Sequence, residues 1–310
     1  MQIVVIGGAG VLGQALLKAI AARGVLTRGD AGPAPVRRVI SVDRAQPPRL
    51  FVEARVEYVR ADLGGPRLLQ AVMGTVTDSV FHVWDSSAGA DQPTPSFGLA
   101  DSLRDLFAVC QLQSSRPKVV LASRFAADGA RAGLHSALPA SREGLTALIG
   151  ELLLEEAARR GQVDGRSLRL ALIAAAPGCA AFLGELMRAL YEGRPATCPI
   201  PCEAPMWLTS APAAARALLH AHELPASAWA LAGVVNAPAR ALNVDALLQA
   251  LVRLTGRATT SLKVEPDPVL SEALAQGAGR VAIQTGLTLG FEDALDAEAV
   301  VRDLVAGPDP

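Results

Sequence analysis

Three glycines near the start of the chain have the spacing needed to hold a phosphate group. The pattern Gly7-x-x-Gly10-x-x-Gly13 directly follows the apolar run Gln2–Ile6 and opens a helical pattern that continues to Ala22. In such a strand–turn–helix unit the first glycine permits the tight turn, the second lets the backbone approach a pyrophosphate, and the third lets the helix pack on the strand. The helix N-terminus then faces the anion. The predicted dinucleotide-binding residues are Gly7, Gly10, Val11, Leu12 and Gly13, and the alternative is a glycine-rich turn without a ligand.

Acidic residues follow the next two strand-like runs. Asp43 ends the run that starts at Val39, where a carboxylate accepts hydrogen bonds from ribose hydroxyls and repels a 2′-phosphate, so NAD is favoured over NADP as the cofactor. Arg44 comes next and could instead meet such a phosphate. Asp62 and Leu63 follow the third run and are placed to touch the adenine edge, or Asp62 caps the helix that follows.

The elements around these residues alternate between strand and helix, which predicts an α/β protein with a doubly wound parallel sheet of the Rossmann type. Strands are expected over 2–6, 39–43, 56–59, 79–83, 118–122 and 168–173, and later helices over 66–73, 99–113 and 142–161. The segment Leu26–Pro35 is rich in Gly, Pro, Asp and Arg, so we expect it to be a loop that lengthens the first crossover.

The order of elements loosens after residue 178. Helices are expected near 182–192, 210–223, 243–256 and 292–306, with a short strand at 233–236. We therefore expect a dinucleotide-binding Rossmann domain over residues 1–177 and a smaller C-terminal α/β substrate lobe over residues 178–310, with a chain that can cross back to the sheet.

Composition and patterning exclude several partners and sites. The chain carries 29 basic and 30 acidic residues mixed along its length, so a small molecule is a better partner than nucleic acid or a membrane surface. Four cysteines, at 110, 179, 198 and 202, have neither disulfide nor metal-ligand spacing, which predicts reduced thiols and no metal site. The N-terminus lacks the basic region of a signal peptide, and the apolar run 170–184 is too short to span a membrane. We expect a cytoplasmic protein.

Five segments beyond the N-terminal motif carry a family resemblance. They are Arg159–Leu170, Trp207-Leu208, Ala217–Ala221, Asn236-Ala237-Pro238 and Glu265–Pro268. With that motif they resemble D-erythronate dehydrogenases, which belong to the NAD-dependent epimerase/dehydratase group of extended short-chain dehydrogenases/reductases. The resemblance covers nearly the whole chain and implies a Rossmann domain, a C-terminal substrate lobe and dimerisation through two helices.

The chain departs from the family at the residues that do the chemistry. The resemblance implies a Tyr-x-x-x-Lys pair just before Glu-Leu-Leu-Leu, in which the Tyr transfers a proton and the Lys lowers its pKa. Those positions read Glu143 and Ala147. Neither of the two tyrosines, Tyr58 and Tyr191, is followed by Lys four residues later, so the pair exists nowhere in the chain.

Other positions that the resemblance assigns to the site also differ. The family's serine after the fourth core strand falls at Arg124, which leaves Ser123 one position early. A small Ala-Ala pair reads Trp84-Asp85, a structural Asn reads Leu99, and an Arg-Pro-Gly that helps to bind the substrate acid reads Ala176-Pro177-Gly178. The phosphate and adenosine half of the site is therefore expected to be intact, and the hydride-transfer half is not.

Five side chains are candidates for a non-standard catalytic site: Asp85, Ser123, Arg124, His135 and Glu143. A desolvated Glu143 would have a raised pKa suited to proton transfer, and its alternative is a solvated carboxylate at a helix start. Arg124 could anchor a carboxylate or pair with Glu143. His135 lies in a polar loop, which favours an exposed bystander, and Trp84 could fill the nicotinamide space or belong to the core.

These residues predict an NAD(H)-binding protein with a non-standard active site. It either carries out non-redox chemistry of the isomerase, lyase or cyclase type, or is catalytically silent. The alternative is an NAD-dependent oxidoreductase or epimerase that acts on a sugar acid or related hydroxy compound with other catalytic residues. We also expect a homodimer through 99–113 and 142–161, because Leu106, Leu145, Leu148, Leu152 and Ala158 are predicted to face outward.

Overall fold

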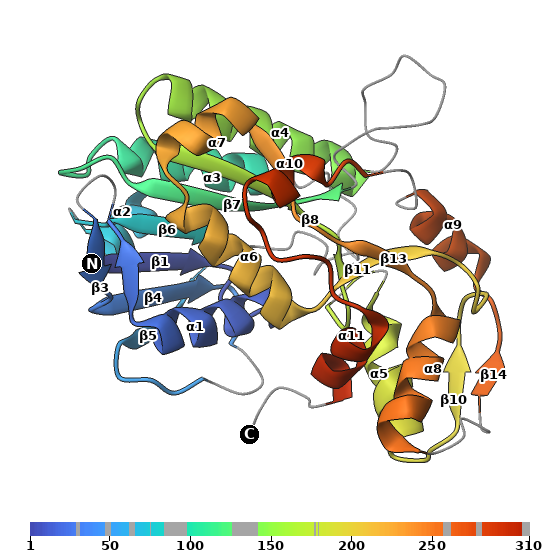
Figure 1. Ribbon diagram of the computed structural model, residues 1–310. Helices are drawn as coiled ribbons and strands as arrows, with labels where there is room; N and C mark the ends of the chain where they lie inside the picture. Colours follow the sequence, from blue (N-terminus) through green and yellow to red (C-terminus); the bar gives the residue numbers. More distant parts are fainter. Residues whose placement is uncertain are drawn as a thin grey trace.

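The computed structural model of the chain describes residues 1–28, 32–46, 51–61, 66–74, 76–83, 98–125, 142–176, 178, 180–256, 262–276 and 281–305. The central sheet contains β1 (Gln2–Ile6), β4 (Arg38–Asp43), β5 (Val56–Arg60), β6 (Ser79–His82), β7 (Lys118–Arg124), β8 (Asp164–Leu170) and β12 (Val234–Asn236). The seven strands are parallel and lie in the order β12-β8-β7-β6-β1-β4-β5 (Figure 1). The order changes direction at β1, and ligands of such sheets bind beyond the carboxyl ends of the strands at that point.

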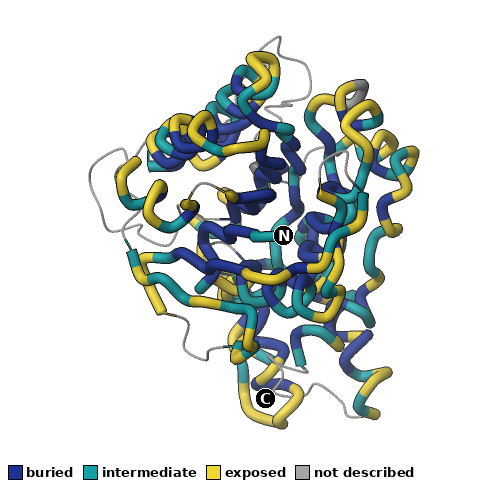
Figure 2. The backbone as a smooth tube through the Cα atoms, turned by 90° about the vertical axis from the view of Figure 1, so that its left-hand side faces the viewer, coloured by how far each residue is buried: buried dark blue, intermediate teal, exposed yellow. Residues whose placement is uncertain are grey.

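Helices cover both faces of this sheet. On one face lie α1 (Val11–Arg23) and α6 (Ala211–Glu223), and on the other α2 (Pro66–Met73), α3 (Gly98–Cys110) and α4 (Arg142–Arg159). Successive residues of β1 alternate between the two layers, since Ile3 packs with α1 and α6 and Val4 with α2, α3 and α4. Both are fully buried, which explains the unbroken apolar run of this strand. Figure 2 shows the buried strands inside and exposed residues on the outer faces of the helices.

The C-terminal part of the chain builds a smaller unit beside the carboxyl ends of the strands (Figure 1). Its strands are β9 (Leu172–Ile173), β11 (Met206–Thr209) and β13 (Arg240–Leu242) in one sheet, and β10 (Ala196–Cys198) and β14 (Leu262–Val264) in another. Its core comes from α5 (Ala181–Tyr191), α8 (Val244–Thr255) and α11 (Ala297–Val305). The short helices are α7 (Ala226–Ala232), α9 (Pro268–Gln276) and α10 (Gln284–Thr288). The chain also returns to the main sheet, because α6 packs on α1 and β12 pairs with β8.

The predicted Rossmann-type fold is confirmed, with two local corrections. The segment Leu26–Pro35, predicted as a loop, forms an antiparallel hairpin of β2 (Val25–Thr27) and β3 (Pro33–Pro35). Prolines are tolerated at this edge, where their missing N–H costs no ladder bond. The strand predicted over 168–173 is divided between β8 and β9, which belong to different sheets. The predicted domain boundary after residue 177 stays a prediction.

The predicted outward face of α3 is wrong at Leu106. This residue is fully buried, because the apolar stripe of α3 faces the sheet and its neighbours on α2. On α4, Leu145 and Leu152 are exposed, as predicted, and Leu148 and Ala158 are half-buried. An apolar stripe therefore lies on the surface of α4.

Candidate cofactor and catalytic site

The glycine-rich turn joins the carboxyl end of β1 to the first turn of α1. Gly7 has a φ of 88°, a left-handed conformation that favours glycine. Its N–H donates to Val42 O at 2.9 Å, which fixes the turn against β4. The side-chain amide of Gln14 donates to Gly8 O at 2.6 Å and closes the turn from the helix side. The first N–H groups of α1, which have no carbonyl partner within the helix, therefore lie at this turn.

Gly13 and Gly10 are needed for different reasons. A Cβ at Gly13 would lie 2.3 Å from Gly7 O and 2.5 Å from Gly8 Cα, so close packing of α1 on the turn requires glycine there. A Cβ at Gly10 would meet nothing nearer than Gly7 O at 3.6 Å, and the backbone of Gly10 is extended, with φ −70°. Neither packing nor conformation of the described chain demands glycine at position 10. The open space there is what a phosphate needs to approach the N-terminus of α1.

Asp43 lies beside this turn, at the end of β4. Its Oδ2 accepts the N–H of Ala9 at 3.0 Å, and its Oδ1 accepts the N–H of Ala45 at 3.1 Å. Each carboxylate oxygen keeps lone pairs that can accept from a ribose hydroxyl. The structure thus brings together the glycines and Asp43, as the sequence predicts. The other predicted adenosine contacts, Asp62 and Leu63, lie outside the described residues.

A second polar group lies at the carboxyl ends of β7 and β8. Arg169 donates to Glu151 through Nε and Nη2, both at 2.8 Å, in a bidentate ion pair. Ser123 Oγ donates to Oε1 of the same carboxylate. Glu151 is only 2% exposed, so its charge depends on these two partners. Sequence reasoning missed Glu151, although a lone acid within the apolar stretch 148–154 is a signal for a buried partner.

The first three turns of α4 carry the two positions that the family resemblance assigns to the Tyr-x-x-x-Lys pair. Glu143, Ala147 and Glu151 are four residues apart, so they share one face of the helix. Glu143 is exposed, which fits the solvated alternative and not a desolvated proton shuttle. Ala147 is buried and offers no polar atom. Ser123 contacts Glu151, which lies two turns after Glu143 on α4. Arg124, the catalytic candidate next to Ser123, is half-buried at the end of β7.

The remaining catalytic candidates, Asp85 and His135, lie outside the described residues, as does Trp84. No group of three or more His, Cys, Asp or Glu side chains that could hold a metal occurs in the described ranges. Across the same ranges, no helix is both long and apolar enough to cross a membrane.

A cavity of about 1530 Å³ borders the turn on the side of α1 and α6. It extends from Ala9 and Val11 to Ala171 at the end of β8 and to Ala237 and Pro238 after β12. Alanine is the commonest residue in its wall, and charged groups such as Arg188 and Asp303 also line it. The space offers a small molecule more apolar contact than hydrogen bonding.

No protein-family model matches the sequence. Two curated proteins, however, are similar to this chain along nearly their whole length. The chain is 31% identical to D-erythronate dehydrogenase of Cupriavidus necator over 97% of both chains. It is 25% identical to D-erythronate dehydrogenase of Haemophilus influenzae, over 98% of this chain and 99% of the relative.

Solved structures share the fold. A nucleoside-diphosphate-sugar epimerase from Agrobacterium tumefaciens superposes with a TM-score of 0.83 at 24% identity, over 99% of this chain and 94% of the other. MoeE5, solved in complex with UDP-glucose and NAD, gives a TM-score of 0.70 at 20% identity, over 98% and 97% of the two chains. With 31% identity to a curated relative along nearly its whole length, the chain belongs to the D-erythronate dehydrogenase family.

Proposed function

We propose that this protein binds NAD(H) on the β1–α1 turn and Asp43, and that it does not oxidise D-erythronate by the proton-transfer mechanism of its family. Its pocket then serves either non-redox chemistry or nucleotide binding without turnover. The observation that carries the cofactor half of the proposal is Gly10, whose missing side chain leaves open space at the N-terminus of α1, where a phosphate can approach. Asp43 beside the turn favours NAD over NADP, because a carboxylate repels a 2′-phosphate.

The catalytic half of the proposal rests on α4. Oxidation of a secondary alcohol requires a base at the hydroxyl while the hydride leaves, a contribution of typically 10²–10⁴-fold. Glu143 is exposed to water and Ala147 cannot stabilise a charge, so neither supplies the base of a Tyr-x-x-x-Lys pair. Ala176, which the family resemblance aligns with a substrate-binding arginine, cannot anchor a carboxylate.

A second candidate function is dehydrogenation of a hydroxy acid with a different base. The 31% identity to D-erythronate dehydrogenase over 97% of both chains favours it. In this case the hydrogen bond from Ser123 to Glu151 would offer a route for the proton, from the substrate hydroxyl through Ser123 to the buried carboxylate. The same carboxylate already accepts two hydrogen bonds from Arg169.

Binding and turnover measurements on the purified protein separate these functions. NADH titration followed by fluorescence is expected to saturate, and NADH formation from NAD with D-erythronate or other aldonates is expected to stay far below about 1 s⁻¹, the low end of ordinary enzymes. Absence of NADH binding at millimolar concentration would overturn the cofactor assignment. Turnover near 1 s⁻¹ would favour the second function, and loss of that turnover in Ser123→Ala would assign the proton route.

We also propose that the protein is a homodimer in which α4 of one copy packs against the partner. Leu145 and Leu152, which are 42% and 56% exposed, form with half-buried Leu148 an apolar stripe that a helical seam would cover. The reduced thiols of Cys110, Cys198 and Cys202 suit a cytoplasmic location for this dimer.

The dimer is tested by charge substitution on α4. Light scattering at tens of micromolar is expected to give a dimer for the native protein and a monomer for Leu145→Glu with Leu152→Glu, because two buried charges cannot be accommodated in an apolar seam. Leu254→Glu, on α8 of the smaller unit, is the control for an equally exposed leucine and should remain dimeric. A monomeric native protein contradicts the proposal.

A further inference from the structure

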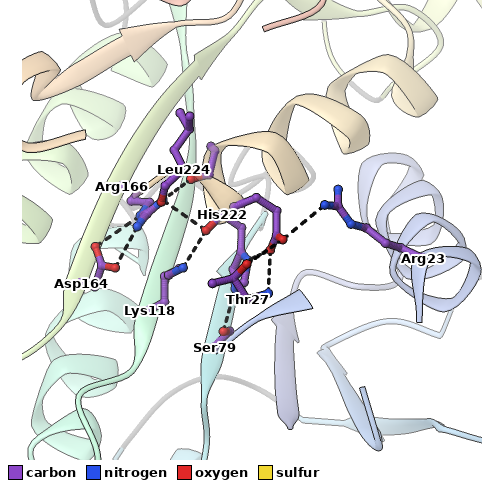
Figure 3. A network of polar contacts seen from close by, with 10 residues as sticks. Arg23, Thr27, Ser79, Lys118, Asp164, Arg166, His222 and Leu224 are labelled. Carbon is purple, nitrogen blue, oxygen red and sulfur yellow. Dashed lines mark hydrogen bonds and ion pairs between the residues drawn. The ribbon is translucent and has the colours of Figure 1, made fainter. Parts of the chain in front are cut away.

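A buried polar cluster lies beneath the C-terminal end of α6, at the edge of the sheet opposite the glycine-rich turn (Figure 3). Ser79, Lys118 and Arg166 belong to the first three residues of β6, β7 and β8, so they meet at the amino ends of these strands. All three side chains are buried. The cofactor and catalytic sites use none of them.

Two buried cations hold the last carbonyls of α6. Lys118 Nζ donates to His222 O at 2.7 Å. Arg166 Nη1 donates to Ala221 O and to Leu224 O, each at 2.5 Å, and the guanidinium also pairs with Asp164 at 2.9 Å. The final carbonyls of a helix lack partners within the helix and carry partial negative charge, so these cations stabilise the end of α6.

His222 is fully buried between two partners that fix its protonation. Its Nδ1 lies 2.7 Å from a carboxylate oxygen of Glu223, and its Nε2 lies 2.8 Å from Ser79 Oγ. A carboxylate only accepts, so Nδ1 carries the proton and Nε2 accepts from the serine hydroxyl. The ring also stacks on Phe81, with centroids 5.3 Å apart. In this arrangement the imidazole is neutral.

A second proton on His222 would disturb the cluster. It would reverse the hydrogen bond to Ser79, whose hydroxyl would then accept, and it would add a third positive charge beside Lys118 and Arg166 at a ring that no water reaches. Burial lowers the pKa of His222, Lys118 and Arg166 lower it further, and only Glu223 raises it. The folded protein therefore disfavours the imidazolium that an unfolded chain forms below pH of about 6.5.

Glu223 connects His222 to the β2–β3 hairpin and to α1. Its carboxylate accepts from Thr27 N at 3.0 Å and Thr27 Oγ1 at 2.9 Å, and it pairs with Arg23 at 3.2 Å. Burial raises the pKa of Glu223, but the hydrogen bonds from His222 and Thr27 outweigh this and leave it at about 2. Glu223 thus stays charged at any pH near neutrality.

The chain of hydrogen bonds Ser79–His222–Glu223 contains the residue types of a hydrolytic triad. A nucleophilic serine must reach its substrate. Ser79 is 1% exposed and His222 is 0% exposed, so no substrate carbonyl can approach the hydroxyl. The cluster is a structural device and not a hydrolase site.

We propose that His222 is an acid-operated latch, in which uptake of a proton by its imidazole releases the C-terminal turn of α6 and the β2–β3 hairpin from the amino edge of the sheet. The charged groups that act on it are Lys118 from β7, Arg166 from β8 and Glu223 from α6. Asp164 pairs with Arg166, Arg23 with Glu223, and Asp78, beside Ser79, with Arg28. The open form binds one more proton than the closed form, so opening becomes progressively less costly as the pH falls below the ordinary pKa of histidine.

Amide hydrogen exchange at pH 7.0, 6.0 and 5.0 tests the latch. After correction for intrinsic exchange rates, amides of Val25–Thr27, of Ala34 between the two prolines of β3, and of the last turn of α6 are expected to open up to about tenfold more often for each pH unit below 6, one proton per opening. In His222→Gln the side chain cannot titrate, and this pH dependence should vanish. His220→Gln, on the same helix, is the matched control and should behave like the native protein.

If His222→Gln does not fold, imidazole ¹H–¹⁵N spectra of the native protein give an independent answer. His222 is expected to show the neutral Nδ1–H form at pH 7, and to gain its second proton only together with the loss of protection in the hairpin and α6. Titration of His222 near pH 6.5 with protection unchanged would overturn the latch, as would acid-induced opening that persists in His222→Gln.

Discussion

Replacing Gly10 with serine is expected to weaken NADH binding by at least about 100-fold, roughly 2.8 kcal/mol, while the protein stays as stable as the native chain. The extended Gly10 is the N-cap of α1, a position where serine is favoured over glycine by a few tenths of a kcal/mol. Its new Cβ meets no protein atom closer than 3.6 Å, so the side chain fills only the space assigned to the pyrophosphate. NADH fluorescence titration and urea unfolding measure the two effects.

Gly13→Ala is the comparison variant and, unlike Gly10→Ser, should lose stability. Its Cβ would overlap backbone atoms at 2.3 and 2.5 Å, so the turn and α1 must separate, and the free energy of unfolding should fall by about 3 kcal/mol. The contrast between the two glycines is the informative result. Native NADH affinity in Gly10→Ser would show that the phosphate does not lie at this turn.

Removing the charge of Glu151 should cost the protein about 3 kcal/mol of unfolding free energy. Glu151→Gln keeps the shape of the side chain but replaces the carboxylate that pairs with the guanidinium of Arg169, which is 13% exposed, by a neutral amide. A buried charge that has lost its partner is strongly destabilising. Replacing both residues by methionine should recover most of the loss, because the charges then disappear together.

Glu155→Gln controls for the loss of one acid on the same helix. Glu155 lies one turn after Glu151 and is exposed, so its substitution should change the unfolding free energy by less than about 0.5 kcal/mol. Urea unfolding of the four proteins gives the comparison. A cost below about 1 kcal/mol for Glu151→Gln would mean that water reaches Arg169 and that the ion pair is not buried in solution.

The parts of the fold that depend on local sequence could be predicted well. The strand Gln2–Ile6 and the helix over 66–73 have the predicted bounds. Each can be recognised from a pattern of neighbouring residues, an apolar run in the strand and a helical period in the helix. The glycine turn and Asp43 were predicted in the same way, because the turn directly follows the apolar run of β1 and Asp43 ends that of β4. The hairpin over Leu26–Pro35 was missed, because its proline and glycine content is typical of a loop.

Contacts between distant segments could not be predicted in the same way. Ser79 and His222 are 143 residues apart, and no local period connects them. The apolar stretch around Glu151 signals a buried acid, but its partners Ser123 and Arg169 are 28 and 18 residues away in the chain. The family resemblance drew attention to Glu143, which is exposed, because it concerns aligned positions and not the burial of each side chain.

The order of synthesis matters for the buried polar cluster at the amino ends of β6, β7 and β8. Lys118 and Arg166 are made long before residues 221–224, whose carbonyls they bind. A nascent chain that has emerged only as far as residue 200 lacks these carbonyls, so both cations are without the acceptors that let them be buried at the edge where β7 and β8 begin. The central sheet therefore cannot reach its final packing during translation until α6 has left the ribosome.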